Sequence, residues 1–389
     1  MVLLAVIYCC FIGLGLHNPL LGAAWPLMSA DFAASLSSAG TLSMLASCTT
    51  IASSLFAHLL VQRIGTGKVV LSGISLIALS MLLFGISQSY PFLFLCTIPM
   101  GLGAGCIDSS LNSFMAAHYK ARYLSWMHCF WGLGAMLAPL FIAFAFGLGY
   151  SWRGGYILIF IILATMVVML LLTQRLWRHI EKAPGAQSAA PSGVGMKGML
   201  EALRIKGAPL AFATFFLYAS VEKSMMLWGA SYLVQVRGLS ADGAAFWVSA
   251  FFLGVTLGRL LGGFVSFKLS DAALIRTGLM LACVGLITML LPLPNAAVYA
   301  SFLLVGLGLA PLFPSMMHQT PLIFGVQHAP ALTSMQIAFL YLSSTFVPTL
   351  LGVLFSHTSF ALMPYLLLGC VLLCIITSSR LAAQRTPHA

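Results

Sequence analysis

Twelve long apolar runs constrain the fold of this chain more than any other feature. Hydrophobic residues make up 61% of its 389 positions, and charged residues make up only 6%. A soluble globular chain has about 25% charged residues, so this composition cannot supply a water-facing surface. A helix that crosses a membrane needs about 20 mostly apolar residues. The sequence therefore predicts an all-α integral membrane protein.

Charges, proline–glycine clusters and polar turns mark the limits of the twelve expected transmembrane helices. We expect these helices at residues 2–24, 38–61, 69–87, 91–117, 123–147, 155–174, 208–235, 243–266, 273–291, 295–319, 330–355 and 359–379. The longest polar stretch follows the sixth run and is rich in Pro, Gly and Ser, which is typical of a flexible linker. We therefore expect a six-helix bundle (1–175), a linker (176–207) and a second six-helix bundle with a short tail (208–389).

The placement of Lys and Arg sets the expected orientation. Outside the apolar runs, all of them except Arg153 and Arg237 follow even-numbered runs or lie in the C-terminal tail. The positive-inside rule then puts the linker and both termini in the cytoplasm of a multi-pass protein of the inner or plasma membrane. Because these cations occupy short loops, the net charge of +11 does not indicate nucleic-acid binding.

The two halves of the chain echo each other at an offset of 205 positions. Gly101-Leu102-Gly103 corresponds to Gly306-Leu307-Gly308, and Arg63 corresponds to Lys268. A constant offset predicts two parallel six-helix halves with a substrate site between them near the middle of the membrane. The same offset places the polar pair His17-Asn18 opposite the pair Glu222-Lys223.

Ionisable residues inside the apolar runs are candidate functional residues, because a charge at membrane depth is costly unless it pairs or faces a wet cavity. Asp108 and Asn112 are spaced i, i+4 and share one helix face. Glu222 shares a face with Tyr218, whereas Lys223 lies about 100° around the helix. A carboxyl group whose solvent access changes can load and release a proton, so we assign proton coupling to Asp108 and Glu222. Static ion pairs are the alternative for both acids.

The remaining candidates fall into three groups. We expect substrate contacts from His17, Asn18, Asn112, Tyr218, Lys223 and Trp228. His128 lies at about the depth of Asp108 and could relay a proton, although a lone His in an apolar helix more often only packs. We expect structural or gating roles for Arg63, for Arg259, which sits between glycines, and for Pro311 and Pro314, which interrupt a helix.

Several classes of protein lack support in the sequence. There is no Gly-x-x-x-x-Gly-Lys-Ser/Thr phosphate-binding loop, and no recognisable Ser/His/Asp set. The nine cysteines show no metal-ligand spacing. We therefore expect neither an enzyme nor a metal or other cofactor.

The chain resembles the major facilitator superfamily over nearly its whole length. Its segment 62–68, QRIGTGK, is similar to the superfamily's loop between helices two and three. The fucose–galactose–glucose permease branch looks closest, because the segments GAGCIDSSLN (103–112), YASVE (218–222), GRLLGG (258–263) and GLGLAPLFP (306–314) are similar to its signatures in helices four, seven, eight and ten. The fucose symporter of this branch also uses an acid in helix one, where this chain has His17 and Asn18.

The resemblance implies a monomeric, proton-linked carrier of sugars or similar small polar solutes that works by alternating access, with the acid of helix four carried over to Asp108. Two rival functions stay open. A proton-driven exporter of amphiphilic drugs would suit a cavity rich in Met and Phe. A receptor or assembly partner that transports nothing belongs to a different class.

Overall fold

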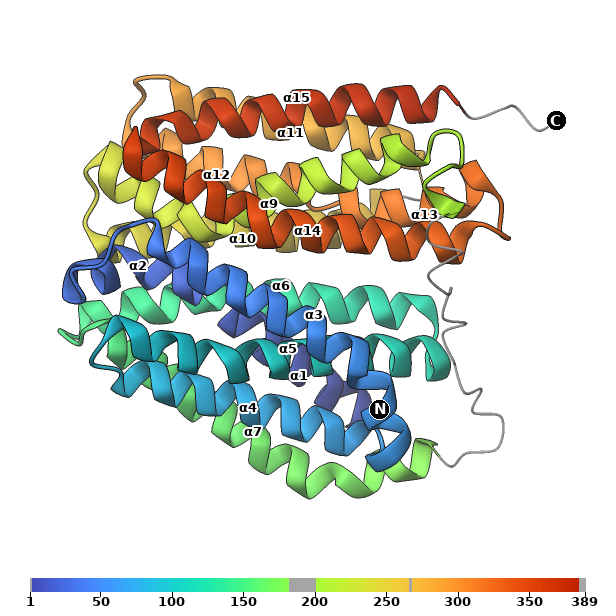
Figure 1. Ribbon diagram of the computed structural model, residues 1–389, viewed down its shortest axis with the longest axis horizontal. Coiled ribbons are helices and arrows are strands. Elements are labelled where there is room, and N and C mark those ends of the chain that lie inside the picture. Colours follow the sequence, from blue (N-terminus) through green and yellow to red (C-terminus); the bar gives the residue numbers. More distant parts are fainter. Residues whose placement is uncertain (1, 182–200, 266–267, 385–389) are drawn as a thin grey trace.

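The computed structural model describes residues 2–181, 201–265 and 268–384, and these three ranges contain helices and no strand. Twelve spans are long and apolar enough to cross a membrane, as the sequence predicts. They form two bundles, which lie one above the other in Figure 1. The end of the molecule at which α1 begins, α7 ends and α9 begins is called the linker side below.

The N-terminal bundle contains six spans built from seven helices. These are α1 (Val2–His17), α2 (Leu20–Asp31), α3 (Ser38–Ile64), α4 (Thr66–Ile86), α5 (Tyr90–His118), α6 (Ala121–Gly147) and α7 (Trp152–Glu181). The C-terminal bundle repeats this plan. Its helices are α9 (Ala208–Arg237), α10 (Ala241–Val265), α11 (Asp271–Leu290), α12 (Asn295–Leu309), α13 (Leu312–Phe324), α14 (Ala329–His357), the 3-10 turn η1 (Phe360–Leu362) and α15 (Met363–Ala382).

Proline breaks two of the spans. The first span separates into α1 and α2 at Asn18-Pro19, where Pro19 has no N–H to donate to a helical carbonyl. The Asn18 side chain turns back and donates to the Leu14 carbonyl at 3.2 Å, which satisfies one acceptor at the break. The tenth span separates into α12 and α13 at Ala310-Pro311. The interruption expected at Pro311 is therefore present.

Close contacts between helices confirm the internal repeat in three dimensions. A Cβ added to Gly103 would lie 2.5 Å from the Gly73 carbonyl oxygen, and one added to Gly308 would lie 2.4 Å from the Gly278 carbonyl oxygen. Both pairs are related by 205 positions. Only glycine lets two helix backbones approach this closely, so each bundle uses the same glycine pair to pack its fourth helix on its third.

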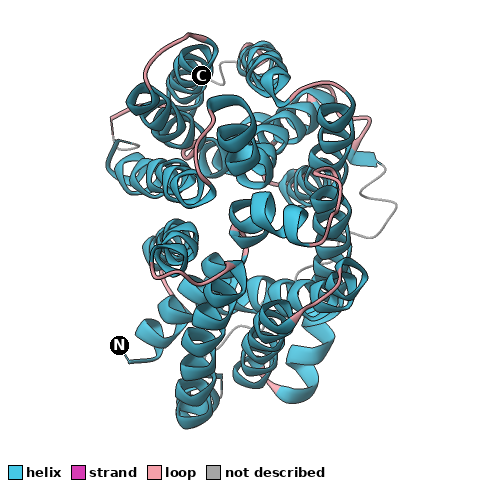
Figure 2. Cartoon of the chain, turned by 90° about the vertical axis from the view of Figure 1, so that its left-hand side faces the viewer, coloured by secondary structure: helices cyan, strands magenta, loops and turns pink. Residues whose placement is uncertain are grey.

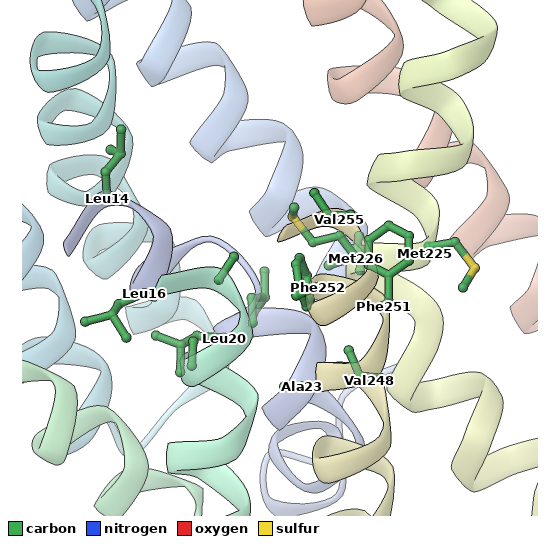
Figure 3. Packing of buried hydrophobic residues seen from close by; sticks show 14 of the residues in the cluster. Leu14, Leu16, Leu20, Ala23, Met225, Met226, Val248, Phe251, Phe252 and Val255 are labelled. Carbon is green, nitrogen blue, oxygen red and sulfur yellow. The ribbon is translucent and has the colours of Figure 1, made fainter. Parts of the chain in front are cut away.

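The bundles meet along α6 with α10, α3 with α14, and α2 with α9 and α10. On the side away from the linker, a Cβ on Gly22 would lie 2.3 Å from the Met226 carbonyl oxygen, and Thr349 donates to the Gly40 carbonyl at 2.8 Å. Figure 3 shows the buried apolar side chains of Ala23 on one bundle and Phe252 on the other at this junction. Figure 1 shows α3 and α14 moving apart toward the linker side, and Figure 2 views the opposite end, where α2 meets the C-terminal bundle.

Two predicted boundaries are wrong. The first span continues to Asp31 instead of ending at residue 24, because Pro26 is accommodated inside α2. The sixth span continues to Glu181, so positions 176–181, expected in the linker, are helical. The buried Trp177 explains this extension, since its ring packs against Gly67 at the start of α4. Of the rest of the expected linker, residues 182–200 lie outside the described residues, whereas 201–207 are described and include the buried Ala202.

Candidate functional site

Three polar side chains form a hydrogen-bonded chain within the N-terminal bundle. On α5, the Asn112 amide donates to the Asp108 carboxylate at 2.9 Å and also to the Asp108 carbonyl at 2.9 Å. The Asn112 side-chain oxygen lies 3.1 Å from Nε2 of His128 on α6. The i, i+4 spacing predicted from the sequence thus brings Asp108 and Asn112 together, and the comparable depth of His128 places it within reach of Asn112.

A second polar group lies in the C-terminal bundle. Glu222 on α9 is buried, and its carboxylate is 3.7 Å from the Arg259 guanidinium of α10 and 3.9 Å from the ammonium of Lys223. The buried Tyr218, one turn earlier on α9, interacts with both Glu222 and Arg259. The two cations compensate the buried carboxylate, and the surplus positive charge of the group falls on its partly exposed member, Lys223.

Arg259 joins the two polar groups across the bundle interface. Its guanidinium donates to the His128 carbonyl at 3.4 Å and lies over the ring of Trp131, 4.8 Å from the ring centre. A cation over an indole face gains a further electrostatic attraction. Close packing supports the contact, since a Cβ on Gly132 would lie 2.6 Å from the hydroxyl oxygen of Thr256. Arg259 is therefore shared between both bundles.

Lys223 connects the same two groups on the other side of the interface. Its charge acts on Asp108 of α5 and on His17, the last residue of α1. The hydroxyl group of Tyr341 on α14 lies within electrostatic range of Asp108. The Lys223 side chain is 25% exposed and Asp108 is partly exposed, although both lie between the bundles. Solvent-accessible space therefore exists between the bundles at this depth.

Two predicted substrate-contacting residues do not join this cluster. Trp228 is fully buried, donates its indole N–H to the Pro348 carbonyl at 2.8 Å, and packs against Gly352. It fixes α9 to α14, so the structure removes the basis for a substrate contact. Asn18 directs its amide to its own helix, as described above. His17 is buried at the break between α1 and α2.

The predicted gating residues are widely separated. Arg63 lies in the last turn of α3 on the linker side, and Pro314 lies in the first turn of α13 just after the break at Pro311. Arg259 pairs with Glu222, not with Asp108.

Sequence reasoning missed two contributors to the cluster. Tyr341 is one of several polar side chains in the run 330–355, shortly before Ser343 and Ser344, and this polar stretch could have pointed to it. The contact of Trp131 with Arg259 leaves no trace in the sequence, because the two residues are 128 positions apart. Among the described residues, no group of three or more His, Cys, Asp or Glu could hold a metal ion.

The two acids have different surroundings. Glu222 has two cations within 4.0 Å, whereas no ion pair to Asp108 occurs in the described part of the chain. Asp108 instead accepts a neutral hydrogen bond from Asn112 and keeps some exposure. Two six-helix bundles with a polar cluster at their interface define a carrier, a transporter that can expose a central site to either side in turn.

Comparison with known proteins identifies the family. The profile of the Major Facilitator Superfamily matches residues 3–296, and the chain belongs to this superfamily. It is a multi-pass membrane transporter and not an enzyme. The glucose/mannose transporter of Bacillus subtilis is 25% identical over 309 residues, which cover 77% of this chain and 74% of that protein.

Solved structures share the fold. A bacterial homologue of the human lysosomal transporter Spinster, in an inward-facing and occupied conformation, has a TM-score of 0.73 at 15% identity and covers 100% of this chain and 98% of that one. The fucose:proton symporter of E. coli has a TM-score of 0.63 at 16% identity, with 98% of each chain covered. These identities establish the common fold alone.

Proposed function

We propose that this transporter carries a small polar solute, a sugar or a similar compound, across the inner or plasma membrane together with protons. One observation carries the proposal: two polar clusters, one from each bundle, meet at the interface between the bundles within the apolar spans. Buried polar groups at this depth are costly and are retained at substrate and ion pathways. The positive-inside rule makes the linker side, with both termini, cytoplasmic.

Asp108 is the proposed proton carrier. It is partly exposed, lacks an ion-pair partner in the described structure, and holds its carboxylate in place through Asn112. A carboxyl group in this setting can be neutral or charged without breaking an ion pair. Glu222 differs because its protonation would leave Arg259 without an anion nearby and would remove the carboxylate that Lys223 pairs with. We therefore assign Glu222 a permanent charge that orders the site, and limit the proton-coupling role expected for both acids to Asp108.

The proposed substrate contacts come from both bundles. Asn112 and His128 offer donors and acceptors from one side, and Lys223 and Tyr218 offer donors from the other. Such a mixture suits the hydroxyl groups of a sugar. The relative from B. subtilis is a glucose/mannose transporter and a structural neighbour is a fucose:proton symporter, and both names favour sugar as the solute class.

Alternating access follows from how the bundles touch. Close glycine contacts join them on the side away from the linker, whereas α3 and α14 move apart on the linker side. We assign this arrangement to the inward-facing state, in which the central cluster opens to the cytoplasm. Rocking of one bundle against the other would close that side and open the opposite one.

The experiment that tests this proposal is sugar uptake into proteoliposomes that contain the full chain. Radiolabelled glucose, mannose, galactose and fucose are each supplied with and without an inward proton gradient. We expect the gradient to drive accumulation of one or more of them. Asp108→Asn should abolish accumulation and retain exchange of labelled for unlabelled sugar, because exchange needs no net proton movement. Asp242→Asn, at an exposed acid on the opposite side, is the matched control and should behave as wild type.

Two results would contradict the proposal. Gradient-driven uptake that persists in Asp108→Asn would remove the coupling role of this residue. No uptake of any sugar, combined with proton-driven extrusion of chemically unrelated amphiphiles, would favour the exporter.

A further inference from the structure

A cavity of about 210 Å³ lies outside the transport site, at the linker side of the N-terminal bundle. It is an open cavity bordered by the turn between α3 and α4 and by the last turns of α7. The side chains of Lys68 and Arg178 line it, and no acidic residue is described in its wall. The described part of the chain shows no ion pair for either cation. A positively charged cavity of this size suits a small anion.

The backbone adds further donors. Gly65, at φ +85°, makes the sharp turn that ends α3 and starts α4. The first helical hydrogen bond there runs from the Val69 N–H to the Gly65 carbonyl. The N–H groups of Gly67 and Lys68 therefore precede the hydrogen-bonded part of the helix, and both residues line the cavity. A helix start of this kind attracts anions, and phosphate in particular.

The wall formed by α7 is fixed to α4 by a hydrogen bond and by close packing. The Gln174 amide donates to the Gly67 carbonyl at 3.0 Å, which fixes α7 against α4. The ring of Trp177 packs so closely on Gly67 that a Cβ there would lie 2.6 Å from it. The indole N–H of Trp177 is buried, and the described structure gives it no acceptor. These contacts with α4 hold the α7 wall of the cavity in place.

An apolar track leads from the cavity toward the middle of the membrane. Leu171 lies three positions before Gln174 and seven before Arg178, on the same face of α7. Val168, Leu171 and Leu172 are each more than half exposed, as expected of a surface that contacts lipid chains. A phospholipid could therefore place its phosphate in the cavity and its acyl chains along α7.

From these observations we propose that the cavity binds the phosphate group of an anionic phospholipid. Basic pockets on the cytoplasmic side of membrane proteins recognise lipid headgroups through such charges. The ligand would hold α4 and α7 together at the end of the N-terminal bundle. This site is separate from the solute site, so the inference does not depend on the transported compound.

Thermal unfolding of the full-length protein in mixed micelles tests this inference. The micelles contain either phosphatidylglycerol, which is anionic, or phosphatidylcholine with the same acyl chains. The cavity variant is Lys68→Gln with Arg178→Gln, and the control is Lys268→Gln with Arg276→Gln, which removes two exposed charges from the same side of the other bundle. We expect phosphatidylglycerol to raise the Tm of wild type and control. The cavity variant should need at least about tenfold more phosphatidylglycerol for the same rise in Tm.

Other outcomes would contradict the lipid site. An equal effect of phosphatidylglycerol on all three proteins, or an equal effect of phosphatidylcholine on wild type, would overturn the proposal. Stabilisation of wild type by inorganic phosphate alone would support a phosphate site and overturn the lipid as its source. If the cavity variant does not fold, quenching of tryptophan fluorescence by phosphatidylglycerol with brominated acyl chains provides the test. A lipid bound in the cavity should quench Trp177, so quenching that is as strong in Trp177→Phe as in wild type would contradict the site.

Discussion

Arg259 of α10 and Glu222 of α9 form an ion pair whose cation also belongs to the opposite bundle. The guanidinium is 3.7 Å from the Glu222 carboxylate, and the same group donates to the His128 carbonyl and covers Trp131 on α6. The charge state of one α9 side chain is therefore linked to the contact between bundles. A substitution of Glu222 should therefore alter the contact between α10 and α6, along which the bundles move.

Loss of Arg259 should destabilise the protein, and loss of Glu222 should partly restore it. Arg259→Gln leaves the buried carboxylate with one cation, the partly exposed Lys223 at 3.9 Å, and Glu222→Gln in that background removes the carboxylate that has lost its buried partner. We expect a coupling free energy of about 0.5–3 kcal/mol from a double-mutant cycle on thermal unfolding. Arg276→Gln, at an exposed arginine on the next helix, serves as control. Additive effects of the two substitutions would mean that the pair does not act as a unit.

His128 should act by hydrogen bonding to Asn112 instead of relaying a proton. Glutamine can replace the hydrogen bond that joins the histidine Nε2 to the Asn112 side chain at 3.1 Å, but it cannot titrate. We expect His128→Gln to retain most of the proton-driven accumulation and His128→Leu to lose about tenfold in rate, since the Asn112 oxygen is left without its partner. Uptake at several external pH values measures both variants. If His128→Gln is as inactive as His128→Leu, the relay is the better interpretation.

Substitution of Gly22 should shift the transporter away from the arrangement described here. Its Cα lies so close to α9 that a Cβ would stand 2.3 Å from the Met226 carbonyl oxygen. Gly22→Val therefore disfavours the state in which the bundles touch on the side away from the linker. Spin labels placed on both bundles at that end report the shift. We expect a larger fraction of molecules to show the longer distance between the two labels. Gly147→Val, where a Cβ meets nothing within 4 Å, should leave the distances unchanged.

Local chemistry determines how much of this structure could be predicted from the sequence. The twelve spans and the break at Pro311 follow from composition and from the missing proline N–H, and the contact of Asp108 with Asn112 follows from helical spacing. The contact of Arg259 with Trp131 depends on how the two bundles dock, which no local pattern encodes. The packing of Trp228 against α14, where a substrate contact was expected, could not be predicted for a similar reason. A tryptophan in a transmembrane helix can face a cavity or a neighbouring helix, and only packing against Gly352 decides between them.

The repeated glycine pairs should give equivalent effects in the two bundles. Gly103 faces the Gly73 carbonyl and Gly308 faces the Gly278 carbonyl, at hypothetical Cβ distances of 2.5 and 2.4 Å. Alanine at either position must push two helices apart, and overpacking of this kind typically costs about 1–3 kcal/mol. We expect Gly103→Ala and Gly308→Ala to lower the unfolding temperature by similar amounts, whereas Gly369→Ala, with nothing within 4 Å, should not lower it. A large effect in one half alone would show that the bundles tolerate helix separation unequally, despite their common design.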